Sequence, residues 1–341
     1  MLEHGGNLSA AIKRFDGASG LRSAWLDIST GINPQPYPVP ALAADAWHRL
    51  PEEHAGLAAA AAHYYGAPAM LPVAGTQAAI QALPCLRSSS RVVVAAPAYA
   101  EHAHCWARAG HAVREVAYAD LAMTVADCDV MVVCNPNNPT GAIVAADVLL
   151  RWAAQLSARG GWLIVDEAFA DTSPQLSILA AAAATAQPGL IVLRSVGKFF
   201  GLAGLRLGFV AAEKTLLSRL AEYLGPWSVS GPAQAIGYAA LSDVAWQQNM
   251  RQQLQQQGQR LQTLLAQNAI ESSGCALFQW WLEPCAEAFH QHMAERAIWV
   301  RLFTRGAGGI RLGLPPDEAG WQRLTVALEE WKDRIPNDIS V

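Results

Sequence analysis

The chain has 341 residues, of which 52% are hydrophobic and 15% are charged, and its formal net charge is −4. A single hydrophobic core stops growing at about 250–300 residues, so this length predicts two structural lobes. The high apolar fraction excludes a disordered chain and indicates extensive burial, which a homodimer would use. The mildly acidic balance, without basic clusters, argues against nucleic-acid and membrane-surface partners and favours a small molecule or a second copy of the chain.

Two long runs, residues 55–86 and 172–193, lack charged side chains. Proline, glycine and glutamine interrupt both, which favours Ala-rich helix and turn over membrane spans, with a buried strand ending the second run. The N-terminus has no signal-peptide pattern. The six cysteines include no CxxC pair and indicate reduced thiols. We therefore expect a cytoplasmic protein.

Two groups of potential metal ligands stand out in the sequence. His102, His104 and Cys105 lie close together, as do His290 and His292. Structural zinc sites use paired ligand groups at matching spacing, and neither group has such a counterpart. We therefore expect no metal.

Short apolar runs alternate with helical patterns between residues 90 and 212. Runs of this length, mostly apolar on both faces, predict strands buried in a mostly parallel sheet with crossover helices, and hence an α/β domain. The predicted strands are Val92–Ala96, Val113–Ala117, Val130–Cys134, Leu163–Asp166, Leu190–Leu193 and Leu207–Ala211.

The composition changes after residue 225. Residues 244–268 contain ten glutamines, and regularly spaced Met and Leu among them predict a long amphipathic helix with a solvated Gln face rather than a low-complexity tract. The rest indicates a smaller α+β lobe, with elements at 275–281, 298–303, 309–312 and 317–334. We expect an N-terminal arm at 1–40, a large domain at 41–225 and a small domain at 226–341.

Lys198 is the most informative single residue. It is one of four lysines, and it lies between a buried strand and a Gly-rich turn. Desolvation in such a place makes a lysine able to bind an aldehyde covalently. A surface lysine in a flexible loop remains the alternative at this point.

Three further loops follow the predicted strands or open a helix, where α/β folds bind ligands. Asp166 closes one strand and can keep a pyridine nitrogen protonated. Asn138 follows another strand and offers an amide to a phenolic oxygen. Together with Lys198 they predict a site for pyridoxal 5'-phosphate. Its phosphate would be held at a helix N-terminus and by side-chain donors. These phosphate donors are Gly75, Thr76, Gln77, Ser195 and Arg206.

The order and spacing of these motifs resemble the fold-type I aminotransferase superfamily. The matching stretches are Gly75-Thr76, Asn135 to Gly141, Asp166 to Phe169, and Ser195 to Gly208. The resemblance covers nearly the whole chain. It implies pyridoxal phosphate as cofactor, a mostly parallel mixed sheet flanked by helices, a smaller α+β domain and a homodimer.

Within the superfamily the chain resembles the threonine-phosphate decarboxylases of cobalamin biosynthesis, which are close to histidinol-phosphate aminotransferases. Three features carry this resemblance: the opening His4 to Asn7, the stretch Asp27 to Pro34, and Phe169 in place of a usual Tyr. It implies decarboxylation of L-threonine O-3-phosphate to (R)-1-amino-2-propanol O-2-phosphate, with a histidinol-phosphate-type aminotransferase as the alternative. The implied substrate-binding residues are His4, Gly5, Gly6, Asn33, Asn138, Arg301 and Arg311.

Two arginines have specific roles in this resemblance. Arg311 would bind the substrate carboxylate, a bidentate task that lysine does poorly, and Arg301 would meet the phosphate together with His4. A salt-bridged strand residue is the alternative for Arg301. Tyr99 would stack on the cofactor ring, and His102 is the competing candidate.

One position departs from the pattern. Leu50 stands where the relatives usually have a tyrosine that reaches the cofactor phosphate of the neighbouring subunit. Tyr64 or Tyr65 could replace that contact, and the prediction of a site shared between subunits is correspondingly weaker.

Two other classes of protein fit less well. Ser195 and Lys198 also match the S-x-x-K pattern of serine acyl-enzymes, which need S-D-N and K-T-G downstream. Here Ser242-Asp243 is followed by Val, and Lys214-Thr215 by Leu, so both patterns fail. A non-catalytic binding protein is disfavoured because every candidate cofactor contact is present.

Overall fold

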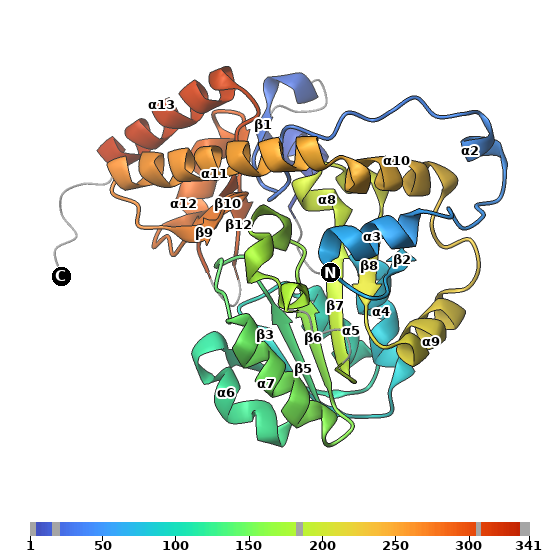
Figure 1. Cartoon of the computed structure of the whole chain (residues 1–341). Coiled ribbons are helices and arrows are strands. Elements are labelled where there is room, and N and C mark those ends of the chain that lie inside the picture. Colours follow the sequence, from blue (N-terminus) through green and yellow to red (C-terminus); the bar gives the residue numbers. More distant parts are fainter. Residues whose placement is uncertain (1–4, 16–20, 182–186, 305–307, 335–341) are drawn as a thin grey trace. The chain divides into compact units, whose positions relative to one another are not determined.

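The computed structural model describes residues 5–15, 21–181, 187–304 and 308–334 (Figure 1). The chain divides into two compact units. The large unit comprises Pro36–Asn138 and Ala142–Gln252, and the small unit comprises Met1–Gln35, Pro139–Gly141 and Gln253–Val341. The predicted small domain began at 226, whereas helix α10 (Gly231–Ser242) belongs to the large unit. It stays there because it packs against α3 (Leu57–Tyr65), close to the hydrogen bond from His54 N to Gln234 Oε1 at 2.8 Å.

A seven-stranded mixed sheet forms the centre of the large unit, in the order β2-β8-β7-β6-β5-β3-β4. Strands β3 to β7 run parallel, and β8 is antiparallel to both of its neighbours. All six predicted strands are confirmed, and the α/β fold with them. The strands are β2 (Leu71–Val73), β3 (Arg91–Ala96), β4 (Ala112–Ala117), β5 (Val130–Cys134), β6 (Trp162–Asp166), β7 (Leu190–Ser195) and β8 (Gly208–Ala211).

The sequence reading missed β2, a three-residue edge strand inside the uncharged run 55–86. Three residues are too few to show a period of two, and Pro72 is tolerated there because the strand lies at the edge of the sheet. In the second uncharged run, 3₁₀ turns at 174–176 and 178–180 precede β7, and residues 182–186 of its Ala-rich part lie outside the described residues. None of the described helices is long and apolar enough to cross a membrane.

Helices cover the buried strands of the large unit. Val92, Val94, Val130 and Val132 pack in one cluster with side chains of α4, α5 and α9, since alternate residues of a strand face the same side. β5, β6 and β7 are buried along their whole length, which explains their continuous apolar sequence. The remaining helices of this unit are α2 (Asp45–His48), α4 (Thr76–Ala82), α5 (Glu101–Arg108), α6 (Leu121–Thr124), α7 (Ala146–Ser157), α8 (Val196–Phe199) and α9 (Lys214–Leu224).

The small unit contains an antiparallel sheet in the order β12-β13-β10-β9 and a parallel pair, β1 with β11. The long Gln-rich helix α11 (Val244–Gln267) is confirmed, and the unit boundary falls within it. The other elements are α1 (Leu8–Phe15), β1 (Leu26–Asp27), β9 (Ser273–Cys275), β10 (Phe278–Trp281), α12 (Ala286–Ala294), β11 (Ile298–Trp299), β12 (Arg301–Leu302), β13 (Ile310–Gly313) and α13 (Glu318–Arg334).

Candidate active site

A cavity lies where β5, β6 and β7 end in the large unit. This is the edge at which parallel α/β sheets bind their ligands. Its lining contains every residue predicted to bind the cofactor. The lining residues are Gly75, Thr76, Gln77, Tyr99, Cys134, Pro136, Asn138, Asp166, Ala168, Phe169, Ser195, Gly197, Lys198, Ala203 and Arg206.

One corner of the cavity is shaped by a glycine that admits no side chain. Gly75 precedes α4 and has a φ of +72°, and a Cβ there would lie 2.5 Å from Nη2 of Arg206. A Cβ on Gly208 would lie 2.8 Å from the Thr76 N–H group. Ser195 also lines this cavity, and its hydroxyl accepts a hydrogen bond from Gly197 N at 3.3 Å. Backbone N–H groups beside a guanidinium suit a phosphate.

Lys198 lies on α8, the short helix that begins directly after β7. Its Nζ is 5.4 Å from the centroid of the Phe169 ring, within the range of a cation–π contact. Phe169 is 5% exposed and follows the strand that carries Asp166. The Lys198 amine therefore lies against an apolar, buried ring.

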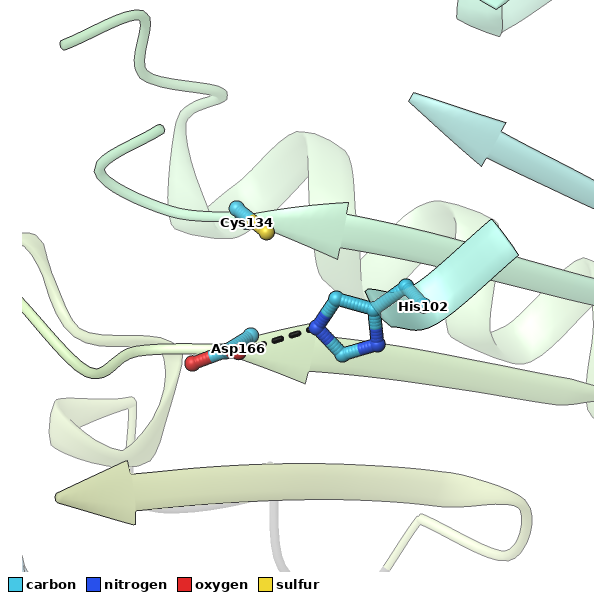
Figure 2. Close-up of side chains that lie close together, drawn as sticks. All are labelled: His102, Cys134 and Asp166. Carbon is cyan, nitrogen blue, oxygen red and sulfur yellow. Dashed lines mark hydrogen bonds and ion pairs between the residues drawn. The ribbon is translucent and has the colours of Figure 1, made fainter. Parts of the chain in front are cut away.

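Asp166 is held by two donors at the end of β6. His102 Nε2 lies 2.9 Å from its Oδ2 (Figure 2). Ala168 N donates to its Oδ1 at 3.0 Å. Burial opposes the charged imidazolium, but hydrogen bonding to Asp166 and Cys134 outweighs it and raises the pKa of His102 to about 10. These two donors fix the orientation of the Asp166 carboxylate, which can accept a further hydrogen bond from a protonated pyridine nitrogen.

His102, Cys134 and Asp166 are all buried, and their ligand atoms lie within 4.8 Å of one another (Figure 2). The sequence grouped His102 with His104 and Cys105 instead. In the structure His104 is exposed and the Cys105 thiol donates to Glu101, so that group does not converge. The bond from His102 to Asp166 accounts for the new cluster without an ion. The absence of a metal stays a prediction.

Tyr99 and His102 were competing candidates for stacking on the cofactor ring. Tyr99 lines the cavity, whereas His102 lies behind Asp166. The Tyr99 hydroxyl donates to Gln77 Oε1 at 3.2 Å, and Gln77 Nε2 donates to Glu101 at 3.0 Å. Burial, and then the charge of Glu101, raise the pKa of Tyr99 to about 12. The phenol is therefore neutral, and its position favours Tyr99 for the stacking role.

The small unit contains most of the predicted substrate residues. Arg301 on β12 and Arg311 on β13 are paired directly across the antiparallel sheet, so both side chains share one face. Burial, and then the charge of Arg301, lower the pKa of Arg311 to about 10. Arg311 Nη2 donates to the Ser29 carbonyl at 2.8 Å. The sheet thus brings two positive charges together.

The other predicted substrate residues lie along the N-terminal part of the same unit. Asn33 is 2% exposed, and its Oδ1 accepts from Gln35 N at 2.8 Å. Gly5 and Gly6 lie against Ser29. His4 lies outside the described residues. Asn138 belongs to the large unit and lines its cavity.

Tyr64 and Tyr65 were the candidates for the contact that Leu50 cannot make. Leu50 is 64% exposed, whereas Tyr65 is buried and Tyr64 is half-buried in the large unit. Arg251 donates to the Tyr64 hydroxyl at 2.9 Å, and Arg194 lies over the Tyr65 ring at 4.4 Å. Both tyrosines thus have partners within the large unit, and a contact of either one with a neighbouring subunit stays a prediction.

Sequence reasoning missed the ionic network beneath the cavity. Arg194 is 2% exposed and donates to Glu167 at 2.6 Å, with Asp171 at 3.4 Å on its other nitrogen. Glu167 also accepts from the Ser177 hydroxyl at 2.5 Å. The sequence did contain a signal for this network. Arg194 is a charged residue inside a strand that is apolar on both faces, and a buried charge needs a buried partner.

Comparison with known proteins adds to this geometry. The model of the family "Aminotransferase class I and II" matches residues 32–330. The chain belongs to this family. The threonine-phosphate decarboxylase of Pseudomonas aeruginosa is 51% identical over 98% of this chain and 99% of its own.

Two solved structures share the fold at lower identity. Histidinol-phosphate aminotransferase from Sinorhizobium meliloti, in complex with pyridoxal-5'-phosphate, is 19% identical with a TM-score of 0.80, covering 95% of this chain and 94% of its own. L-threonine-O-3-phosphate decarboxylase from Porphyromonas gingivalis is 20% identical with a TM-score of 0.75, and the match covers 90% of this chain and 99% of its own. The fold-type I architecture is therefore confirmed.

Pyridoxal phosphate is the cofactor of this family of enzymes, and the cavity fits it. Gly75 leaves room beside a guanidinium and N–H groups for a phosphate, Asp166 offers a supported acceptor to a pyridine nitrogen, and Lys198 supplies the amine for the aldehyde.

Proposed function

We propose that this protein decarboxylates L-threonine O-3-phosphate to (R)-1-amino-2-propanol O-2-phosphate, a reaction that serves cobalamin biosynthesis. The observation that carries the proposal is the pairing of Arg301 with Arg311 across β12 and β13. Like charges directly opposite in a sheet repel each other, so a ligand with two anionic groups stabilises the pair. Similarity to a threonine-phosphate decarboxylase over nearly the whole chain supports the same substrate.

Each group has a chemical role in this proposal. Arg311 binds the carboxylate and Arg301 the phosphate, which leaves the orientation of the Cα substituents to decide which bond breaks. Pyridoxal phosphate, when bound, supplies a protonated ring that accepts electrons from that bond. Asp166, supported by His102, would hold the ring proton in place. Lys198 would hold the cofactor aldehyde until the substrate amine displaces it, and its freed ammonium group would donate a proton to Cα once CO₂ has left.

The cysteines and the exposed apolar side chains bear on the cellular compartment and the oligomeric state. The chain has six free cysteines and no disulfide among its described residues, which suits a reducing cytoplasm. Trp47, Leu50 and Trp227 are large apolar side chains that are 67%, 64% and 59% exposed. We propose that a second copy covers them, as a homodimer.

The test uses the purified holoenzyme with L-threonine O-3-phosphate. We expect release of CO₂ and formation of the amino alcohol phosphate without any 2-oxo acid as co-substrate. The variant Arg311→Gln should lose most of the activity at low substrate concentration. Transfer of the amino group to 2-oxoglutarate without CO₂ would instead establish the histidinol-phosphate-type aminotransferase.

A further inference from the structure

The peptide at Ser29 lies between the start of the described chain and Arg311, within the small unit. Gly6 N donates to Ser29 Oγ at 2.9 Å, and that hydroxyl donates to Asp27 Oδ1 at 2.7 Å. On the other side, Arg311 Nη2 donates to the Ser29 carbonyl at 2.8 Å. Ser29 is 0% exposed, so water does not compete for these bonds.

The glycines at positions 5 and 6 are required by this contact. A Cβ on Gly5 would lie 2.7 Å from the Ser29 carbonyl oxygen, the same atom that accepts from Arg311. Gly6 has a φ of +85°, which other residues rarely adopt. Any side chain at position 5 must therefore displace either the arm or the carbonyl that holds the guanidinium.

The far side of this peptide is fixed. Gly313 N donates to the Ile28 carbonyl at 2.7 Å, and Ile28 N donates to Trp299 O at 2.9 Å. Beyond Gly6, α1 is anchored by Leu8 and Ala11, which pack against Trp25 and Ala294. With both flanks fixed, a change in how the arm docks is transmitted to the Ser29 peptide.

We propose that Ser29 is a positioning residue that couples docking of the Gly5-Gly6 arm to the orientation of the Arg311 guanidinium. The arm thereby controls affinity for the carboxylate of the substrate. This inference rests on the proposed function, in which Arg311 binds that carboxylate. It assigns a role to Gly5 and Gly6 that requires no contact with the substrate.

The experiment compares Gly5→Ala and Ser29→Ala with Ser9→Ala, a matched control on the exposed side of α1. We expect KM for L-threonine O-3-phosphate to rise about tenfold in the first two, the loss of roughly one charged hydrogen bond, with kcat nearly unchanged. The inhibition constant of the product, which lacks the carboxylate, should stay within about twofold of wild type. Thermal unfolding confirms that each variant is folded.

The outcomes separate the inference from the function on which it rests. If product affinity falls as much as substrate affinity, the arm does not act through Arg311, and the inference is overturned. Unchanged KM in Gly5→Ala and Ser29→Ala overturns it as well, while CO₂ release by the wild type leaves the function standing. In the Arg311→Gln background, Gly5→Ala should raise KM no further. Full additivity of the two substitutions would also overturn the coupling.

Discussion

Replacing His102 by leucine should destabilise the cofactor-free protein more at low pH than at high pH. The His102 and Asp166 side chains are 2% and 7% exposed, and their atoms lie 2.9 Å apart. Removing one partner of a buried ion pair costs about 3–5 kcal/mol. Asp166 keeps its bond from Ala168 N and lines the cavity, which water can enter. Folding raises the pKa of His102 from about 6.5 to about 10, and each pKa unit corresponds to about 1.4 kcal/mol, so we still expect a loss of about 3–5 kcal/mol at pH 6.

The dependence on pH follows from the two states of His102. Its pKa is about 10 in the folded protein, and about 6.5 in an unfolded chain. Because the folded state binds the proton more tightly, the stabilisation is complete below about pH 6.5 and is lost as the pH rises through about 10. The difference between wild type and variant should shrink over this window toward about 1 kcal/mol, the value of a neutral hydrogen bond.

The assay is urea unfolding followed by tryptophan fluorescence at pH 6, 8 and 10. Cofactor is removed first, because its binding would itself stabilise the native state. His104→Leu is the control, since His104 lies on the same helix and is exposed, and it should change the free energy of unfolding by less than about 0.5 kcal/mol. A difference between wild type and His102→Leu that is constant or grows with pH would refute the imidazolium assignment.

Three further predictions concern the same unit. Gly75→Ala should weaken pyridoxal phosphate binding at least about tenfold in a fluorescence titration, because its φ is +72° and a Cβ would lie 2.5 Å from a guanidinium nitrogen. The control Gly160→Ala, at a glycine with a φ of +68° but open space around it, should bind pyridoxal phosphate normally. Equal weakening of binding in both variants would argue against a role of Gly75 in holding the phosphate. Lys198→Ala should erase the absorbance band of the purified protein near the visible edge, and a retained band would show that another group holds the cofactor. Arg194→Met should lower the free energy of unfolding by about 3–5 kcal/mol in urea, because two buried carboxylates lose their partner; an unchanged midpoint would contradict this.

The sequence alone located the cofactor cavity because its residues follow strand ends directly. Apolar runs marked the strands, and parallel strands bring their carboxyl ends to one edge, so Asn138, Asp166 and Lys198 had to converge. Gly75 was equally visible, since a glycine before a helix marks a tight approach of the backbone. These features are local, and a single strand with its following loop is enough to encode each of them.

Only the tertiary structure decided which distant side chains support these groups. His102 meets Asp166 across 64 positions, and Arg311 meets Ser29 across 282. Such pairs depend on how a helix packs on the sheet and on the register between strands, and neither leaves a periodic pattern in the sequence. For the same reason the sequence did not indicate that Arg251 would donate a hydrogen bond to Tyr64, 187 positions away.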